Sequence, residues 1–147
     1  MDSDTRLKMA FSLIVGGLYL VFGLVQVLGS FGMFASLIDT LNIDDNLFGG
    51  FVLLLIGVVY LFVVRSIKRD SIEGSAFLFT GIFLSLLYAS INLVILGATL
   101  LSALLEGESL GVFQGITPIV YLGLLSLIGL YIWRSTFSFS RLSKAGV

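Results

Sequence analysis

The chain has 147 residues, of which 58% are hydrophobic and 12% charged, and its mean hydropathy is +1.13. Soluble domains carry roughly 25% charged residues, so this composition excludes an ordinary soluble fold and indicates a single membrane domain over residues 1–147. The net charge of −1 gives no reason to expect a nucleic-acid partner. The chain has no Cys and no His, which removes thiol chemistry and most zinc, copper and haem sites, so we expect no cofactor.

Four apolar stretches predict four membrane spans, because one span needs about 20 residues. The stretches cover approximately residues 8–28, 47–64, 74–105 and 115–133. The apolar pattern of the first stretch continues to Ile38, so the first and third are longer than a bilayer requires and must tilt, bend or project beyond it. Gly29, Gly32 and Gly97 are candidate bend points. The predicted fold class is an all-α, polytopic membrane bundle of four transmembrane helices.

The first stretch is preceded by basic residues, as a secretory signal peptide is. It is longer than the apolar part of a usual signal peptide, and no small-residue cleavage motif follows it. We therefore expect it to remain as a membrane span.

The connections before the second and fourth spans carry helix-start signals. Asn46 precedes the second span, Glu108 and Ser109 precede the fourth, and Pro118 lies in its first turns. Such side chains satisfy free N–H groups at a helix start, so the acids there are interpreted as caps and solvated loop. A cation site is the alternative. It would use five acids: Asp39, Asp44, Asp45, Glu106 and Glu108.

Every basic residue lies before the first stretch, between the second and the third, or after the fourth, and these segments share one side of the membrane if each stretch crosses it. The basic residues are Arg6, Lys8, Arg65, Lys68, Arg69, Arg134, Arg141 and Lys144. Cytoplasmic loops retain Lys and Arg, so this distribution predicts a multi-pass protein of the cell membrane with both termini in the cytoplasm.

The two halves of the chain resemble one another. A shift of 69 residues places Tyr19 on Tyr88 and Arg65 on Arg134 without a gap. This match predicts two similar hairpins in one bundle, related by an axis along the membrane normal. The hairpins would cover approximately residues 6–69 and 74–138.

Small and polar residues recur on one face of the two long stretches, at alternating spacings of four and three. On the first stretch they are Ser12, Gly16, Tyr19, Gly23, Gln26 and Ser30. On the third they are Ser85, Tyr88, Asn92, Thr99 and Ser102. Gly50, Gly57 and Tyr60 form a weaker seam on the second stretch. Lipid offers no hydrogen bonds, so these faces should turn toward protein or water.

These seams allow three interpretations. In the first, the two long helices pack seam to seam at the bundle centre. In the second, Gln26, Tyr19, Tyr88 and Asn92 line a polar path or pocket. In the third, one seam binds another subunit.

No Asp, Glu, Lys, Arg or His falls inside any span, which argues against a proton-coupled pump. A Ser-His-Asp set and a phosphate-binding loop are missing as well, so we predict that the chain is not an enzyme. The predicted function is a non-catalytic small integral membrane subunit or scaffold of a larger complex. Its expected partners are the lipid bilayer and other integral membrane subunits or further copies of itself. The alternative is a passive transporter or channel for a neutral or weakly polar solute, acting as a homo-oligomer.

Overall fold

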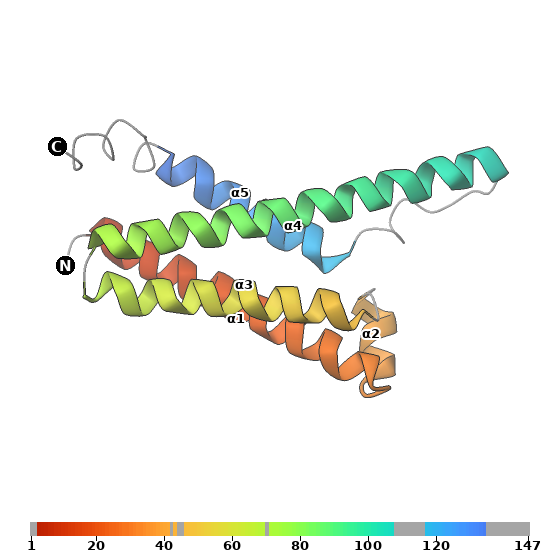
Figure 1. Ribbon diagram of the computed structural model, residues 1–147, viewed down its shortest axis with the longest axis horizontal. Coiled ribbons are helices and arrows are strands. Elements are labelled where there is room, and N and C mark those ends of the chain that lie inside the picture. The colour runs from red at the N-terminus through yellow and green to blue at the C-terminus, as the bar shows by residue number, and fades with distance from the viewer. Residues whose placement is uncertain (1–2, 42, 44–45, 70, 108–116, 135–147) are drawn as a thin grey trace.

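The structure is a computed structural model, and it describes residues 3–41, 43, 46–69, 71–107 and 117–134 (Figure 1). Within these ranges the chain forms the helices α1 (Ser3–Ser30), α2 (Ala35–Leu41), α3 (Leu47–Ile67), α4 (Ser71–Glu106) and α5 (Pro118–Trp133). The helices α1, α3 and α4 are long and apolar enough to cross a membrane, and α5 is a shorter apolar helix of 16 residues. Short α2 lies at the end of the bundle opposite the N-terminus (Figure 1).

The first apolar stretch bends where glycine permits it. Helix α1 ends at Ser30, and the rest of the apolar pattern to Ile38 lies in the turn that follows and in α2, so of the predicted alternatives this stretch bends. Gly32 has φ +77°, a left-handed conformation that glycine adopts without steric cost, and the predicted bend at this residue is confirmed. The reversal places α2 against α1, where the Ile38 side chain occupies the space beside Gly29. Gly29 is therefore a packing site inside α1 and not a bend.

Helix α3 begins where the sequence predicts it. The Asn46 side-chain oxygen accepts hydrogen bonds from the backbone N–H of Phe48 at 3.0 Å and of Gly49 at 3.5 Å. Pro118 occupies the start of α5, where its missing N–H costs no helical hydrogen bond. The other predicted caps, Glu108 and Ser109, lie outside the described residues.

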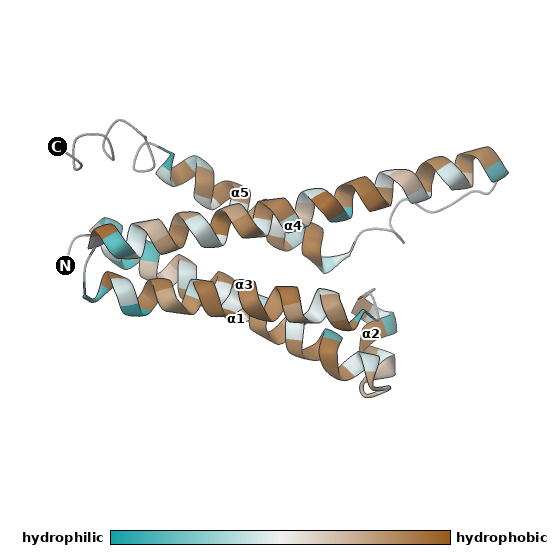
Figure 2. Ribbon diagram, viewed as in Figure 1, coloured by the Kyte–Doolittle hydropathy of each residue, from teal (hydrophilic) through white to brown (hydrophobic). Residues whose placement is uncertain are grey.

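Helix α4 is one uninterrupted helix of 36 residues, so the bend proposed at Gly97 does not occur. At 1.5 Å per residue it is about 54 Å long, against about 32 Å for α3. The outer part of α4 consequently extends past α3 and α2 (Figure 1). Figure 2 shows that this extension remains hydrophobic almost to its tip.

Helices that follow one another in the chain are the main neighbours in space. Helix α1 packs chiefly on α3, α3 on α4 and α4 on α5, whereas α1 and α4 have little direct contact. The prediction that the two long helices pack directly on each other is therefore wrong. The reason is connectivity: successive long helices run antiparallel and pack as neighbours, which leaves α1 and α4 parallel and on either side of α3.

The core lies among all four long helices. Its buried apolar side chains are Val15, Tyr19, Leu53, Ile56, Tyr60, Val63, Ile67, Leu78, Ile82, Ile119, Leu122 and Trp133. The start of α1, the link from α3 to α4 and the end of α5 lie at one end of the bundle (Figure 1). The basic residues of the described ranges are found at that end, and Asp39 and Glu106 are found toward the other.

Candidate functional site

Glycines bring the backbones of α1 and α3 into contact. A Cβ built on Gly23 would lie 2.9 Å from the Leu54 backbone nitrogen and 3.1 Å from the Gly50 carbonyl oxygen. One built on Gly57 would lie 3.0 Å from the backbone nitrogen of Leu20. One built on Gly16 would lie 2.8 Å from the Tyr60 Cβ and 3.3 Å from the Gly57 carbonyl oxygen. The glycine face of the first span thus packs on the seam of the second span and offers no surface to another subunit.

Four hydroxyl groups, one from each long helix, gather in the middle of the bundle. The Tyr60 hydroxyl lies 3.0 Å from the Ser126 hydroxyl and 3.4 Å from that of Ser85. The ring of Tyr19 stacks on that of Tyr60, with centroids 6.0 Å apart and an interplanar angle of 19°. All four side chains are completely buried. We call Tyr19, Tyr60, Ser85 and Ser126 the central hydroxyl cluster. Its hydrogen bonds, which lipid could not supply, join α3 to α4 and α5, and Tyr19 of α1 joins the cluster by ring stacking.

A second polar layer lies two helical turns from the central hydroxyl cluster. Gln26 follows Tyr19 by seven residues, about 10.5 Å along α1, and is 1% exposed. A Cβ built on Gly49 of α3 would lie 2.6 Å from Gln26 Nε2 and 2.8 Å from the Tyr88 hydroxyl of α4. Gly49 thus makes room for both polar groups. Together with Thr117, which lines the same cavity as Gln26, these residues form what we call the outer polar layer.

Several buried polar atoms of α1 have no hydrogen-bond partner within the described part of the chain. They are Ser12 Oγ, the Tyr19 hydroxyl oxygen, and both Gln26 amide atoms, Nε2 and Oε1. The Tyr19 hydroxyl lies near Ser85 and Ser126 without the geometry of a hydrogen bond. Ser12, Tyr19 and Gln26 are seven residues apart and share one face of α1. This line of uncharged donors and acceptors can bind a polar partner but carries no group that is charged near neutral pH.

The outer part of the α4 seam lies away from α1. Thr99 and Ser102 are exposed, and Asn92 is half-buried. Thr99 donates its hydroxyl hydrogen to the Ile95 carbonyl at 3.0 Å, and Asn92 Nδ2 donates to the Tyr88 carbonyl at 2.9 Å. The predicted packing of Thr99 and Ser102 against the first span is not found, because α4 extends beyond the helices that could cover them. On α1, Ser30 likewise bonds to its own helix, at the Val27 carbonyl.

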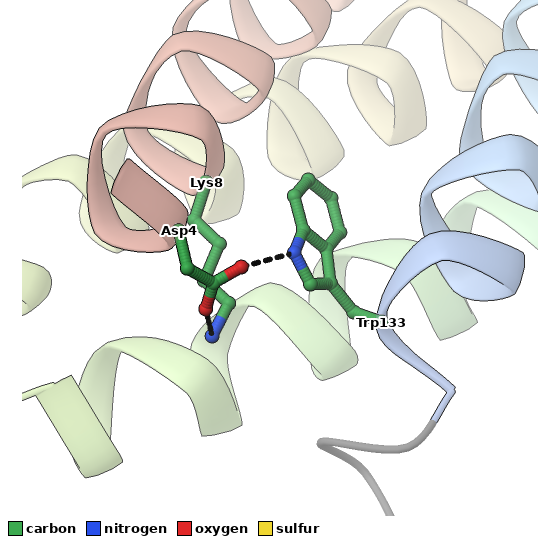
Figure 3. Close-up of polar contacts among 3 residues, drawn as sticks. All are labelled: Asp4, Lys8 and Trp133. Atoms are coloured by element: carbon green, nitrogen blue, oxygen red, sulfur yellow. Dashed lines mark hydrogen bonds and ion pairs between the residues drawn. The ribbon is translucent and has the colours of Figure 1, made fainter. Parts of the chain in front are cut away.

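A polar contact that sequence reasoning missed connects the two ends of the described chain (Figure 3). Lys8 Nζ lies 2.8 Å from Asp4 Oδ2, and Trp133 Nε1 donates to Asp4 Oδ1 at 3.1 Å. Asp4 precedes the apolar stretch of α1, and the hydrogen bond from Lys8 holds the pKa of Asp4 below its usual value. The four-residue spacing of Asp4 and Lys8 was a readable signal for the ion pair. Nothing in the sequence pointed to Trp133, 129 residues away.

The cation-site interpretation of the outer acids receives no support from the residues that the structure describes. Among them, no three Asp or Glu side chains converge as a metal ion requires. Asp44, Asp45 and Glu108, three of the five acids concerned, lie outside the described ranges. The interpretation therefore remains a prediction for those positions.

Comparison with known proteins places the bundle in a family. The sequence profile of a family described as the MJ0565 integral membrane domain matches residues 4–135. The chain belongs to this family. The uncharacterized protein MJ0565 of Methanocaldococcus jannaschii is 28% identical to it over 121 residues, which cover 80% of this chain and 82% of the relative. No solved structure matches the chain. Family membership and the apolar helices together confirm the predicted fold class, a four-helix integral membrane bundle.

Proposed function

We propose that the chain is a non-catalytic subunit of a larger assembly in the cell membrane and that it docks to its partner through the outer half of α4. One observation carries the proposal: this half-helix presents polar and small residues on a surface that no other described helix covers. Asn92, Thr99 and Ser102 provide the polar groups there, and Gly97 provides a site where a Cβ would meet nothing within 4 Å. Such residues mark helix–helix interfaces in membranes, because lipid gains nothing from them.

The length of α4 supports the same proposal. A bilayer with its headgroups is about 40–45 Å thick, which is less than the roughly 54 Å of a 36-residue helix. Leu101, Leu104 and Leu105 near its outer end are 61%, 75% and 81% exposed. To place the whole helix within the bilayer would need a tilt of roughly 35–40°, at the upper end of the usual range. A partner helix against this end would cover the apolar surface without such a tilt.

The interior of the bundle gives less support to the alternative, a passive transporter for a neutral or weakly polar solute. The unpartnered atoms of Ser12, Tyr19 and Gln26 favour a polar path. However, the cavity beside Gln26 has a volume of only about 10 Å³, room for one water molecule. The larger hollow, about 520 Å³, lies along exposed apolar residues of α5. A conducting pore needs a continuous water-filled gap, so the subunit role is preferred.

The orientation we propose has both termini in the cytoplasm. The basic residues of α1, of the link between α3 and α4, and of the end of α5 share one end of the bundle. The positive-inside rule assigns that end to the cytoplasm, which would direct the outer half of α4 toward the external leaflet and beyond.

Two glycine substitutions test the docking surface. Gly97→Leu on α4 and Gly17→Leu on α1 both enter space where a Cβ meets nothing within 4 Å, so neither should disturb the folding of the chain itself. Affinity purification from native membranes should recover fixed heterologous partners with wild type and with Gly17→Leu, and should lose them with Gly97→Leu. Retention of the same partners by Gly97→Leu would contradict docking through α4. A pure homo-oligomer that transports solute in liposomes would contradict the subunit role and support the alternative.

A further inference from the structure

The Gln26 side chain is buried beside a small cavity between α1 and the start of α5. Its amide nitrogen and oxygen both lack hydrogen-bond partners, although the residue is 1% exposed. The cavity has a volume of about 10 Å³. Phe22, Leu53 and Leu122 contribute apolar walls, and the first residues of α5 form the wall that faces Gln26. A buried amide with no partner destabilises the folded chain, so a ligand that satisfies it is favoured.

The start of α5 offers polar groups to the same cavity. Thr117 is the N-cap residue and has the extended backbone of a cap, yet its side chain makes no capping hydrogen bond. Pro118, the next residue, has no N–H. The groups at this helix start that can form hydrogen bonds include the Thr117 hydroxyl and the Ile119 N–H, one of the donors that a helix start leaves without an intrahelical partner.

We propose that one water molecule binds in this cavity and connects Gln26 of α1 to the first turn of α5. The volume fits a single water, which needs roughly 10–15 Å³ and makes about three hydrogen bonds. The water oxygen would accept from Gln26 Nε2 and the Ile119 N–H, and the water hydrogens would be donated to Gln26 Oε1 and the Thr117 hydroxyl. None of the lining residues is charged, so a neutral ligand fits the site better than an ion.

The water would add a connection where direct contact is small. Helix α5 packs chiefly on α4 and only along a smaller area on α1. A bridge from Gln26 would hold the outer end of α5 against α1, at the end opposite the contact of Trp133 with Asp4. This role is independent of any partner protein.

Solution NMR in detergent micelles or nanodiscs can detect the water. The sequence has two glutamines, Gln26 and Gln114, so selective ¹⁵N-glutamine labelling gives two side-chain amide pairs, and a Gln114→Glu variant identifies them. At a pH where amide exchange is slow, the Gln26 amide protons should show a cross-peak to water that Thr117→Val weakens and Thr117→Ser keeps at full intensity. Absence of the cross-peak in wild type overturns the proposal, and a cross-peak of unchanged intensity in Thr117→Val overturns the proposed hydrogen bond to Thr117.

Stability measurements test the bridge by a second route. A double-mutant cycle compares the unfolding equilibrium constants of Gln26→Met, Thr117→Val and the double variant. If the water connects the two side chains, the effect of the double variant should differ from the product of the single effects by roughly three-fold or more, although no direct hydrogen bond joins the two residues. The matched control pairs Gln26→Met with Thr80→Val, which removes an exposed hydroxyl bonded to its own helix at the Ala76 carbonyl, and should show no coupling. If the effects of Gln26→Met and Thr117→Val on stability are additive and Gln26→Met stabilises the chain, the cavity holds no water and the proposal is wrong. The reason is that replacing an unpaired buried amide by an apolar group stabilises a protein. The NMR measurement needs neither Gln26→Met nor this cycle, so it decides the matter even if that variant fails to fold.

Discussion

The contact between α1 and α3 depends on glycine, and Gly23→Ala tests how closely the two backbones approach. The added Cβ would lie 2.9 Å from the Leu54 backbone nitrogen and 2.9 Å from Leu54 Cγ. Optimal separations between such atoms are about 3.5–4.0 Å, so the helices must move apart by several tenths of an ångström. Because two of the nearest atoms belong to the α3 backbone, a side-chain rotation cannot relieve the clash.

Gly17→Ala is the matched control. Gly17 lies on the same helix, and a Cβ there would meet nothing within 4 Å. Both substitutions gain the same helix propensity, about 0.8–1.0 kcal/mol. Overpacking in a core costs about 1–3 kcal/mol, so Gly23→Ala should be less stable than Gly17→Ala by roughly that amount, while Gly17→Ala equals or exceeds wild type.

Unfolding in mixed micelles, followed by circular dichroism as the denaturing detergent fraction increases, measures the difference. A difference of 1.4 kcal/mol corresponds to a ten-fold change in the unfolding equilibrium constant, well within the range of such an assay. Equal stability of the two variants would refute the close backbone contact. It would mean that α3 does not lie against Gly23 and that the glycine face is free for another protein after all.

Three further predictions follow from the other contacts. Tyr60→Phe should lower stability by about 0.5–1.5 kcal/mol because it removes the hydroxyl that bonds Ser85 and Ser126, whereas Tyr131→Phe on the exposed face of α5 should have no effect in the same assay. Reporter fusions at the link between α3 and α4 and at the C-terminus should behave as cytoplasmic and one at Gly107 as external; an external C-terminus would exclude the proposed orientation. Because the folded-state pKa of Asp4 is lowered, its stabilisation is present above the unfolded pKa of about 3.9 and is lost as the pH falls. Acidification to pH 3 should therefore destabilise wild type slightly more than Asp4→Asn, and an equal loss would show that this carboxylate contributes nothing.

Hydropathy predicted the spans because lipid imposes a simple demand on every residue that faces it. Apolar composition does not show where a helix breaks within an apolar stretch. Nothing in apolar composition separates the end of α1 from α2, which are divided by a turn in which Gly32 and Phe34 have left-handed backbones. The Asn46 and Pro118 signals were accurate because they act locally, through the first free N–H groups of one helix.

The predicted site shows a different limit. Heptad spacing identified which face of α1 turns inward, and Ser12, Tyr19 and Gln26 are all buried on it. Spacing says nothing of which helix lies opposite, so the seam was assigned to α4 although its glycines meet α3. Ser126 was missed because a single serine in an apolar helix forms no periodic pattern, even though it completes the central hydroxyl cluster.

Trp133, the only tryptophan of the sequence, lies where the last described helix meets the first. Its indole is 2% exposed, donates to Asp4, and has an edge contact with Phe11 at 5.1 Å between ring centroids. Its neighbours come from the beginning of the chain, so its surroundings become native only after α5 has joined α1. The protein thus contains its own optical reporter: the emission wavelength of one natural fluorophore distinguishes a chain whose ends have met from one still open, without any label.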